Sequence, residues 1–407
     1  MTAAIGRKDF VMFCQRRDNG IPIGVAVNRR TVDQHNRSAI RAHPERSRRV
    51  IPIRLIINIC IIDVHVWHVA YINTNRYNRS MQNILDEFTR SIDPRTSLFD
   101  VKIESDDNRT LMLSGRVLDE SQLDELPRLF PSIELDTTSI RILSRESHER
   151  FHVATNLTGL YEKPTFGMPL SSELCYGTEL EVLDEEKRWV FTRQRDGYLG
   201  WAYRSYLSEG LAPAATHLVL APAIELLTEP NERSEVLTRV VSATGVVLEE
   251  NLDGWTRISA NKTGWILSAH LRALNDLPKT LEEKRATLIK DSQRVIGISY
   301  LWGGTSGNGI DCSGFARLLH RWLGIDIPRD ADMQCSAAKP IEAPYEVGDL
   351  FFFAEDDGKR KITHVGMSLG GWRMIHSSRS RNGVYVDDVQ EVNFLKEIFV
   401  SAGSFLR

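Results

Sequence analysis

One stretch decides the fold of this chain: YLWGGTSGNGIDCSGF, residues 300–315. Its first twelve residues are rich in glycine and cannot form a long helix. Apolar residues then recur with helical spacing after Cys312, and Gly324 is placed to end the helix. The spacing predicts a helix whose first turn carries Cys312, beside unpaired backbone N–H groups and the positive end of the helix dipole. That position predicts a lowered thiol pKa and a reactive thiolate.

A thiolate nucleophile needs a general base, and two histidines lie in strand-like runs downstream. His364 lies in ITHVGMSL, residues 362–369, and His376 lies in WRMIHS, residues 372–377. A two-residue Gly-Gly loop between the runs would place the two imidazoles on opposite faces of the sheet. A three-residue loop would pair His364 directly with His376 on one face, with Cβ atoms about 4.5–5.5 Å apart. A Cys–His–His relay requires the shared face, so we predict the longer loop. The alternatives are a cysteine buried for packing and two unrelated strand histidines.

Five blocks of sequence carry a resemblance: YLWGG to DCSGF, then PRD, GDLFFF, HVGM and IHS. In this order they resemble the NlpC-type papain-like cysteine peptidases of bacterial cell-wall metabolism, over about residues 280–407. The resemblance implies Cys312 as the nucleophile, His364 as the base and His376 as the residue that orients His364. It also implies a papain-like α+β peptidase domain and no metal or cofactor.

The same resemblance implies roles for residues around the nucleophile. Tyr300 would face the cleft and donate its hydroxyl to a developing oxyanion, together with a backbone N–H of the nucleophile or its neighbour. Trp302 would form an apolar wall, and Asp311 and Ser313 would contact the substrate. A simple helix N-cap is the equal alternative for Asp311.

Length and charge limit what the rest of the chain can be. A chain of 407 residues predicts two to four domains, and 42% hydrophobic residues are enough for several cores. Residues 1–80 hold fourteen basic and five acidic side chains, a net charge of +9, which leaves −12 on the remaining residues. A body this acidic disfavours nucleic acid as a partner. The five cysteines are odd in number and irregularly spaced, which disfavours a disulfide framework or a structural zinc site and favours a reducing compartment.

Residues 1–80 differ from the rest of the chain. They contain Arg-rich clusters such as RSRR at 46–49, and one interrupted apolar run, 50–62, that is too short to span a bilayer. That run also lies too far along the chain for an ordinary secretory signal. We expect that the segment is not part of the mature protein and that Met81 is the natural start, which predicts a cytoplasmic protein with no membrane contact. A basic arm for nucleic acid is the alternative.

Three further regions precede residues 275–407, which the resemblance identifies as the expected peptidase domain. Residues 81–150 combine helix-like and strand-like runs and predict a small α+β unit, the N-terminal module. An internal repeat covers residues 151–210 and 211–274, because each is predicted to be a set of short strands with a Gly-Trp pair near its end. These first and second repeat units resemble bacterial SH3-like β-barrels, in which the tryptophans would fill the cores. The sequence therefore predicts a multidomain protein of four parts.

Two such barrels before the peptidase resemble the arrangement in intracellular γ-D-glutamyl-L-diamino acid endopeptidases. In those enzymes the first barrel borders the active-site cleft. An acid, a tyrosine and an aspartate bind the free amine of the substrate's terminal L-alanine. The matching positions, which we call the amine clamp, are Glu173, Tyr198 and Asp330, with Glu179 as a rival of Glu173. A buried ammonium needs such acceptors to offset its desolvation.

The resemblance therefore implies a cysteine endopeptidase that acts on murein-derived peptides. It would cut the γ-D-Glu to diamino acid bond of L-Ala-γ-D-Glu-diamino acid peptides with a free N-terminus. An exported enzyme that cuts intact peptidoglycan is one alternative, and it requires an export signal, which we do not find. A non-catalytic muropeptide-binding protein and a different acyl transfer on the same scaffold are the others. The preferred diamino acid, the role of the N-terminal module and the oligomeric state stay open at this point.

Overall fold

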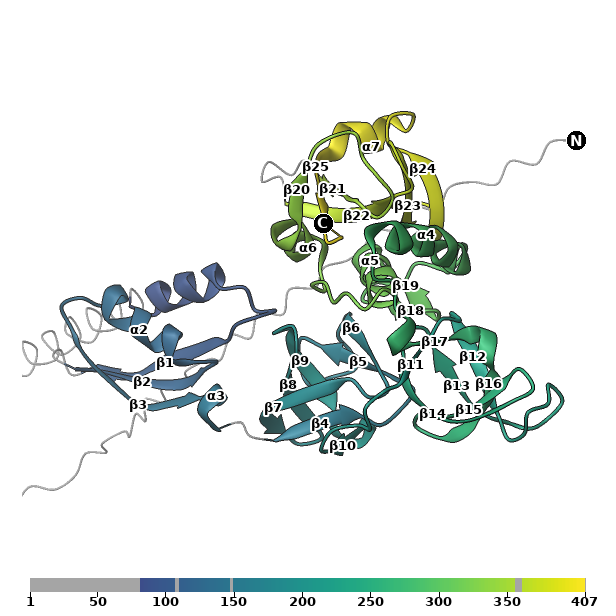
Figure 1. Ribbon diagram of the computed structural model, residues 1–407. Coiled ribbons are helices and arrows are strands. Elements are labelled where there is room, and N and C mark those ends of the chain that lie inside the picture. Colours follow the sequence, from purple (N-terminus) through teal and green to yellow (C-terminus); the bar gives the residue numbers. More distant parts are fainter. Residues whose placement is uncertain (1–80, 107–109, 147–148, 356–360, 407) are drawn as a thin grey trace, which may run out of the picture. The chain divides into compact units, whose positions relative to one another are not determined.

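The structure is a computed structural model, and it describes residues 81–406 except 107–109, 147–148 and 356–360 (Figure 1). The expectations for residues 1–80 lie outside the described residues. Within the described part the strands form sheets of three, seven, seven, two and six strands, so the molecule is a strand-rich multidomain protein.

The N-terminal module is a three-stranded sheet with helices packed on it. Its elements are the helix over 81–91, β1 (Phe99–Asp106), β2 (Thr110–Val117), α2 (Glu120–Leu129), β3 (Glu134–Ile142) and α3 (Leu143–Glu146). β2 lies in the centre, antiparallel to β1 and parallel to β3. Asp119 caps α2 by accepting from the backbone N–H of Ser121, and the apolar faces of both longer helices meet the sheet in one core.

The two repeat units have the same strand order. The first contains β4 (Arg150–Val153), β5 (Leu157–Tyr161), β6 (Leu170–Cys175), β7 (Glu179–Glu186), β8 (Trp189–Gln194), β9 (Leu199–Tyr203), the 3-10 turn η1 (Arg204–Tyr206) and β10 (Leu207–Glu209). The second contains β11 (His217–Val219), β12 (Ala223–Leu227), β13 (Val236–Val241), β14 (Gly245–Leu252), β15 (Trp255–Ser259), β16 (Thr263–Leu267), the 3-10 turn η2 (Ser268–His270) and β17 (Leu271–Ala273). The first sheet runs β10-β4-β7-β8-β9-β5-β6, and the second runs β17-β11-β14-β15-β16-β12-β13. Trp201 and Trp265, from the two Gly-Trp pairs, are both buried.

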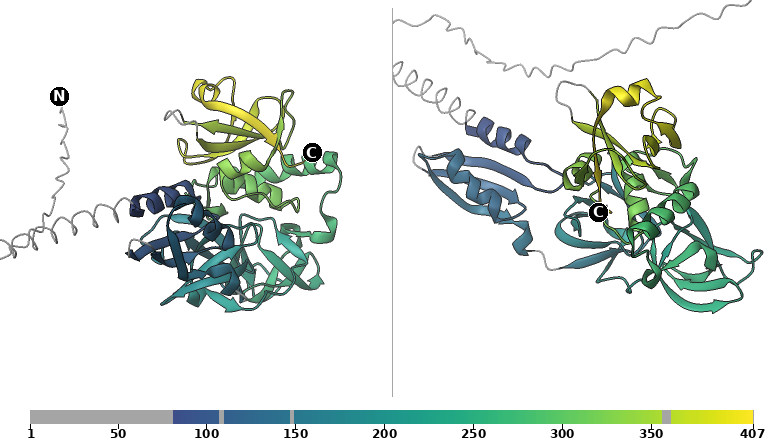
Figure 2. Two further views of the ribbon diagram at one scale, coloured as in Figure 1. Left: turned by 90° about the vertical axis from the view of Figure 1, so that its left-hand side faces the viewer. Right: turned by 45° about the horizontal axis from the view of Figure 1, so that its top comes forward.

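The peptidase domain places helices against a six-stranded antiparallel sheet (Figures 1 and 2). In the order of the sheet, the strands are β20 (Lys339–Ile341), β25 (Phe399–Ser404), β21 (Leu350–Ala354), β22 (Ile362–Ser368), β23 (Arg373–Ser378) and β24 (Gly383–Asp388). The helices and the small hairpin are α4 (Leu281–Ser292), β18 (Thr305–Ser306), β19 (Gly309–Ile310), α5 (Cys312–Arg321), α6 (Ala331–Ala337) and α7 (Asn393–Ile398). α5 packs its apolar face on β22 and β23, which fixes the start of α5 against these two strands.

The helix expected after the glycine-rich loop is confirmed. α5 begins at Cys312, and its N-cap is Asp311, whose Oδ1 accepts from the backbone N–H of Gly314 at 2.6 Å. The helix ends at Arg321, and Gly324 follows with a φ of 77°, the left-handed conformation that glycine adopts without strain.

The register expected between the two histidine strands is wrong by two residues. The structure pairs Ser368 with Met374, whereas the three-residue loop would pair Ser368 with Trp372. His364 and His376 are therefore diagonal neighbours and do not lie directly opposite each other. A shift of two residues keeps the alternation of side chains, so both imidazoles still lie on one face of the sheet, as predicted.

Two consecutive glycines explain why the observed turn between β22 and β23 differs from the expected three-residue loop. Gly370 and Gly371 both have positive φ, 103° and 62°. This backbone lets Leu369 N donate to Arg373 O at 2.7 Å, which closes a wider turn before β23 begins.

A buried arginine joins α5 to the first repeat unit. The side chain of Arg329 is 1% exposed, and its Nη2 lies 2.7 Å from Oδ2 of Asp311. Its Nη1 donates to Ser313 Oγ at 3.0 Å, and its Nε donates to Ser172 Oγ of β6 at 3.0 Å. The cap of the nucleophile helix, the PRD segment and the first repeat unit therefore meet on one guanidinium.

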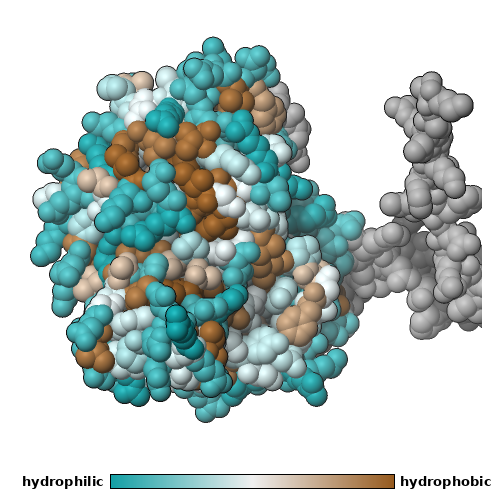
Figure 3. All heavy atoms as spheres, turned by 90° about the vertical axis from the view of Figure 1, so that its right-hand side faces the viewer, coloured by the Kyte–Doolittle hydropathy of each residue, from teal (hydrophilic) through white to brown (hydrophobic). Residues whose placement is uncertain are grey.

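The surface mixes hydrophobic and hydrophilic side chains. Figure 3 shows one face of the molecule, on which hydrophobic side chains gather in patches between hydrophilic ones. Scattered exposed apolar residues of this kind are common on folded proteins. Among the described helices, none combines the length and the apolar character needed to cross a membrane.

The buried ion pair generates a stability prediction. The variant R329M leaves the Asp311 carboxylate buried without its partner, so we expect the free energy of unfolding to fall by about 3–5 kcal/mol. Urea unfolding followed by tryptophan fluorescence measures it. The control is R239Q, which breaks an exposed pair with Glu225 and is expected to cost less than about 1 kcal/mol. Equal losses in the two variants would contradict the structural role of Arg329.

Candidate active site

The Cys312 thiol lies where α5 meets β22. Its side chain is buried, with a residue exposure of 7%, and the backbone N–H groups of Val365 and Ser313 are directed at the sulfur. Val365 follows His364 directly in β22. The helix start therefore supplies the thiol, and the adjacent strand supplies the imidazole.

The expectation of a lowered thiol pKa is wrong. Burial raises the pKa of Cys312 to about 12, and the charge of Asp311 acts in the same direction. The N–H groups of Val365 and Ser313 lower the pKa, but they do not reverse the shift. A helix terminus contributes about 0.3–1 kcal/mol. Full burial can shift a pKa by about 3–5 units, several times as much.

His364 is held neutral for the same reason. Burial, with a smaller contribution from the neighbouring His376, lowers its pKa to about 3. At neutral pH the pair is therefore a thiol and a neutral imidazole. A pair in these states suits general-base chemistry, in which the proton leaves the sulfur during the attack, and does not suit a thiolate–imidazolium ion pair.

The two histidines form a directed relay with an aspartate. His364 Nε2 lies 2.7 Å from His376 Nδ1, and His376 Nε2 lies 3.0 Å from Asp387 Oδ2. The Asp387 carboxylate accepts a hydrogen bond from the N–H at His376 Nε2, so His376 Nδ1 carries a lone pair and accepts a hydrogen bond from His364 Nε2. The lone pair of His364 then stands on Nδ1, which is the nitrogen left for the Cys312 proton.

A glycine in the HVGM block makes the relay possible. Gly366 stands on the same strand face as His364, two residues further along β22. A Cβ at Gly366 would overlap the Met374 side chain and would lie 3.0 Å from the His376 Cβ. Glycine therefore lets the His376 ring approach His364 across the wider hairpin.

Asp387 was missed in the sequence, although a signal for it exists. It lies in β24, within YVDD, and β24 pairs with β23 so that His376 stands opposite Tyr385. A residue two positions from Tyr385 faces the same side, which selects Asp387 over Asp388. Arg381 Nη2 lies 2.8 Å from Asp387 Oδ1, and the hydrogen bond to His376 lowers the Asp387 pKa, with a smaller contribution from Arg381.

The aromatic residues expected beside the nucleophile differ in burial. Burial raises the pKa of Tyr300, and the charges of Cys312 and Asp311 act on its hydroxyl in the same direction. Tyr300 is therefore near the thiol, as an oxyanion donor must be. Trp302 is 61% exposed, so its ring is open to contact with a ligand.

Asp311 and Ser313 are engaged by the protein itself. Asp311 Oδ1 accepts from Gly314 N, and its Oδ2 accepts from Gly303 N at 2.9 Å. Ser313 Oγ donates to Asp311 Oδ1 at 3.2 Å. These bonds favour the cap alternative for Asp311, with Ser313 as part of the same buried network.

Two members of the amine clamp are in direct contact. Tyr198, 4% exposed, donates its hydroxyl to Asp330 Oδ2 at 3.0 Å. Tyr198 precedes β9 in the first repeat unit, and Asp330 is the N-cap of α6 in the peptidase domain. The structure thus joins the two domains at this hydroxyl and carboxylate.

The third member of the clamp lies against the glycine-rich loop. Glu173 Oε2 accepts from Thr305 N at 2.8 Å, and Glu173 N donates to Gly303 O at 3.0 Å. Burial raises the pKa of the Glu173 carboxyl. Its rival Glu179 is exposed on β7, so the structure places Glu173, and not Glu179, beside the loop that leads to Cys312.

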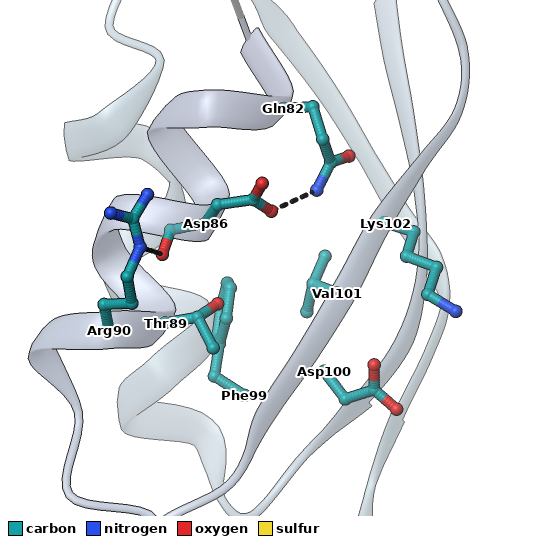
Figure 4. Close-up of a pocket in the computed structure, with 8 residues that line it drawn as sticks. All are labelled: Gln82, Asp86, Thr89, Arg90, Phe99, Asp100, Val101 and Lys102. Carbon is teal, nitrogen blue, oxygen red and sulfur yellow. Dashed lines mark hydrogen bonds between the residues drawn. The ribbon is translucent and has the colours of Figure 1, made fainter. Parts of the chain in front are cut away.

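A separate hollow of about 390 Å³ lies in the N-terminal module, between the helix over 81–91 and β1 (Figure 4). Gln82 Nε2 donates to Asp86 Oδ1 at 2.8 Å within it. Among the described residues that line it there is no cysteine or histidine, so it offers no counterpart of the Cys312 relay.

A buried thiol that passes its proton to an oriented imidazole is the machinery of a cysteine peptidase, a hydrolase, and this chain is one. Residues 297–402 match the NlpC/P60 family, and residues 160–207 match the bacterial dipeptidyl-peptidase SH3 domain. The chain therefore contains an NlpC/P60 peptidase domain preceded by an SH3-like domain, which confirms the resemblance seen in the sequence.

Relatives found by sequence and structure comparison agree with this assignment. The chain is 29% identical to the γ-D-glutamyl-L-lysine dipeptidyl-peptidase of Bacillus cereus over 246 residues, which cover 56% of this chain and 73% of that protein. It is 27% identical to the enzyme of the same name from Bacillus subtilis over 242 residues, 56% of this chain and 79% of that protein. A crystal structure of an NlpC/P60 family protein from Bacillus cereus shares the fold, with a TM-score of 0.55 and 24% identity over 63% of this chain and 100% of that one.

The burial of the thiol generates a spectroscopic prediction. A pKa raised to about 12 keeps Cys312 protonated at neutral pH. We expect no thiolate signal below about pH 9 in the ultraviolet difference spectrum between the protein and the C312S variant. The subtraction removes Cys175 and Cys335, which both proteins share. A thiolate step between pH 5 and pH 8 would show a standing ion pair and contradict the neutral resting state.

The relay generates a kinetic prediction. In D387N an amide can donate to His376 Nε2, which moves the His376 proton to Nδ1 and disturbs the His364 tautomer. We expect kcat to fall by about 10–100-fold with little change in KM. The matched control is D388N, at a residue whose side chain accepts from Gln390 N in the following turn. The role of Asp387 is refuted when both variants lose the same activity.

Proposed function

We propose that this enzyme hydrolyses the bond between γ-D-Glu and the diamino acid in peptides that begin with a free L-Ala. One observation carries the proposal: the Tyr198 hydroxyl meets the Asp330 carboxylate at 3.0 Å, where the first repeat unit meets the peptidase domain. Such a junction closes one end of a cleft and offers acceptors to an ammonium group. The names of the Bacillus cereus and Bacillus subtilis relatives support the same substrate class.

The chemistry at the closed end suits a cation. The Asp330 side chain is 23% exposed, so one carboxylate remains within reach of a ligand. The Glu173 carboxyl is buried with a raised pKa, and a bound ammonium would favour its ionised form. A peptide whose terminal amine is acetylated brings neither the charge nor the three donors.

The reaction uses the relay described above. Cys312 attacks the carbonyl carbon of the γ-D-Glu residue while His364 Nδ1 takes the thiol proton. The oxyanion is stabilised by backbone N–H groups at the start of α5 and by the Tyr300 hydroxyl. His364 then gives its proton to the leaving amine, and water hydrolyses the thioester that remains on Cys312. Peptides of this kind are released when cell wall is turned over, so a cytoplasmic recycling enzyme is part of the proposal.

A matched pair of peptides tests the proposal. We expect L-Ala-γ-D-Glu-L-Lys to be cleaved with a kcat/KM about 10–100-fold above that of its N-acetylated form, because the acetyl group removes a charge-assisted contact. Release of L-Lys measured by chromatography gives both rates. The C312S variant is the control for background hydrolysis.

Two other results are informative. Equal cleavage of the two peptides would contradict recognition of the amine by Glu173, Tyr198 and Asp330. Cleavage of intact wall fragments in place of both peptides would favour the exported enzyme.

A further inference from the structure

Arg95 of the N-terminal module reaches the candidate amine site. Its Nη1 lies 2.8 Å from Asp330 Oδ2 and 2.8 Å from Asp332 Oδ1. Its Nη2 lies 2.7 Å from Asp332 Oδ2 and 2.7 Å from Asp93 Oδ2, and its Nε lies 3.0 Å from Asp93 Oδ1. All five N–H bonds of the guanidinium are directed at carboxylates, so Arg95 is held in one position.

The backbone around Arg95 is also docked. Leu199 N donates to Arg95 O at 2.7 Å, directly after Tyr198 in the first repeat unit. The side chain of Arg95 contacts Asp330 of the peptidase domain, and its carbonyl contacts the first repeat unit. The segment between the helix over 81–91 and β1 therefore lies at a junction of three domains.

The two oxygens of Asp330 have different surroundings. Oδ2 accepts from the Tyr198 hydroxyl and from Arg95 Nη1. Oδ1 has a long ion pair with Arg329 Nη1, at 3.8 Å, among the contacts of the described residues. Arg95 and Tyr198 together fix the carboxylate by one oxygen and leave the other oxygen to a ligand.

We propose that Arg95 is a positioning residue for recognition of the substrate's terminal amine, and that the N-terminal module is thereby a working part of the peptidase. The inference rests on the proposed function, since it names the group that holds Asp330 in place for that ammonium. Arg95 lies outside both residue ranges that match known families, 160–207 and 297–402. The proposal therefore assigns a role to the N-terminal module, whose function the sequence left open.

Charge explains why an arginine can stand beside an ammonium site. Asp93, Asp330 and Asp332 carry three negative charges against the single positive charge of Arg95. The cluster keeps a net charge of −2 and still attracts a cation. Without Arg95 the carboxylates of Asp330 and Asp332 would repel each other, and Asp330 would lose a bond that fixes its rotamer.

The test compares two arginines that both dock the N-terminal module. R95Q removes the bond to Asp330. R116Q removes a bridge from Asp100 in the same module to Asp184 of the first repeat unit, with distances of 2.9 and 2.8 Å, and involves none of the amine-clamp residues. Kinetics are measured on the full chain with L-Ala-γ-D-Glu-L-Lys and its N-acetylated form.

We expect R95Q to raise KM for the free peptide about tenfold, with kcat and the cleavage of the acetylated peptide nearly unchanged. We expect R116Q to change KM for the free peptide less than about twofold. The variant R95K keeps the charge but loses the planar fork, so we expect partial recovery. These results together would support the positioning role.

Several results would overturn it. Equal changes of KM in R95Q and R116Q would show that Arg95 only docks the N-terminal module. An equal loss of activity on both peptides in R95Q would show that Arg95 has no part in recognition of the amine. A lower KM in R95Q would mean that Arg95 competes with the substrate. In all three cases the wild-type protein still prefers the free peptide. If the unchanged protein does not distinguish the two peptides, the proposed function itself has failed, and the role of Arg95 falls with it.

Discussion

The buried ion pair between Asp311 and Arg329 holds together the helix that carries Cys312, the glycine-rich loop and the first repeat unit. One carboxylate caps the nucleophile helix, holds the glycine-rich loop through Gly303 N and neutralises a guanidinium that is 1% exposed. The same guanidinium reaches Ser172 in the first repeat unit. Burying both charges is costly, so such a pair is better explained by the geometry that it specifies than by the stability that it adds. Here that geometry is the position of the Cys312 thiol.

The burial of Cys312 bears on how the proposed nucleophile would work. The thiol and the imidazole are each driven to the neutral form by burial, which outweighs the helix dipole beside Cys312. Catalysis then depends on where the imidazole lone pair points. That direction is set at the far end of the relay, where the Asp387 carboxylate fixes the tautomer of His376 and thereby that of His364. In this mechanism the reactivity of Cys312 would come from the orientation of the His364 imidazole and not from a preformed thiolate.

The specificity that we propose would be a property of the junction between domains. The Asp330 carboxylate comes from the peptidase domain, the Tyr198 hydroxyl from the first repeat unit and the Arg95 guanidinium from the N-terminal module. None of these domains contains all three side chains of the proposed amine site by itself. Ligand sites often form at such interfaces, because each domain can hold its own side chains rigidly while the cleft lies between them.

Features that depend on neighbours along the chain could be predicted from the residues alone. The apolar spacing after Cys312 gave a helix that begins at that residue, and side-chain alternation placed His364 and His376 on one face. The predicted hairpin register was wrong because Gly370 and Gly371 permit more than one loop. The predicted thiol pKa was wrong because burial depends on what packs around the sulfur. Arg95 and Asp330 stand 235 residues apart, so no local pattern could join them. That contact became visible only in the folded molecule, because charge pairing across domains depends on how separate domains dock.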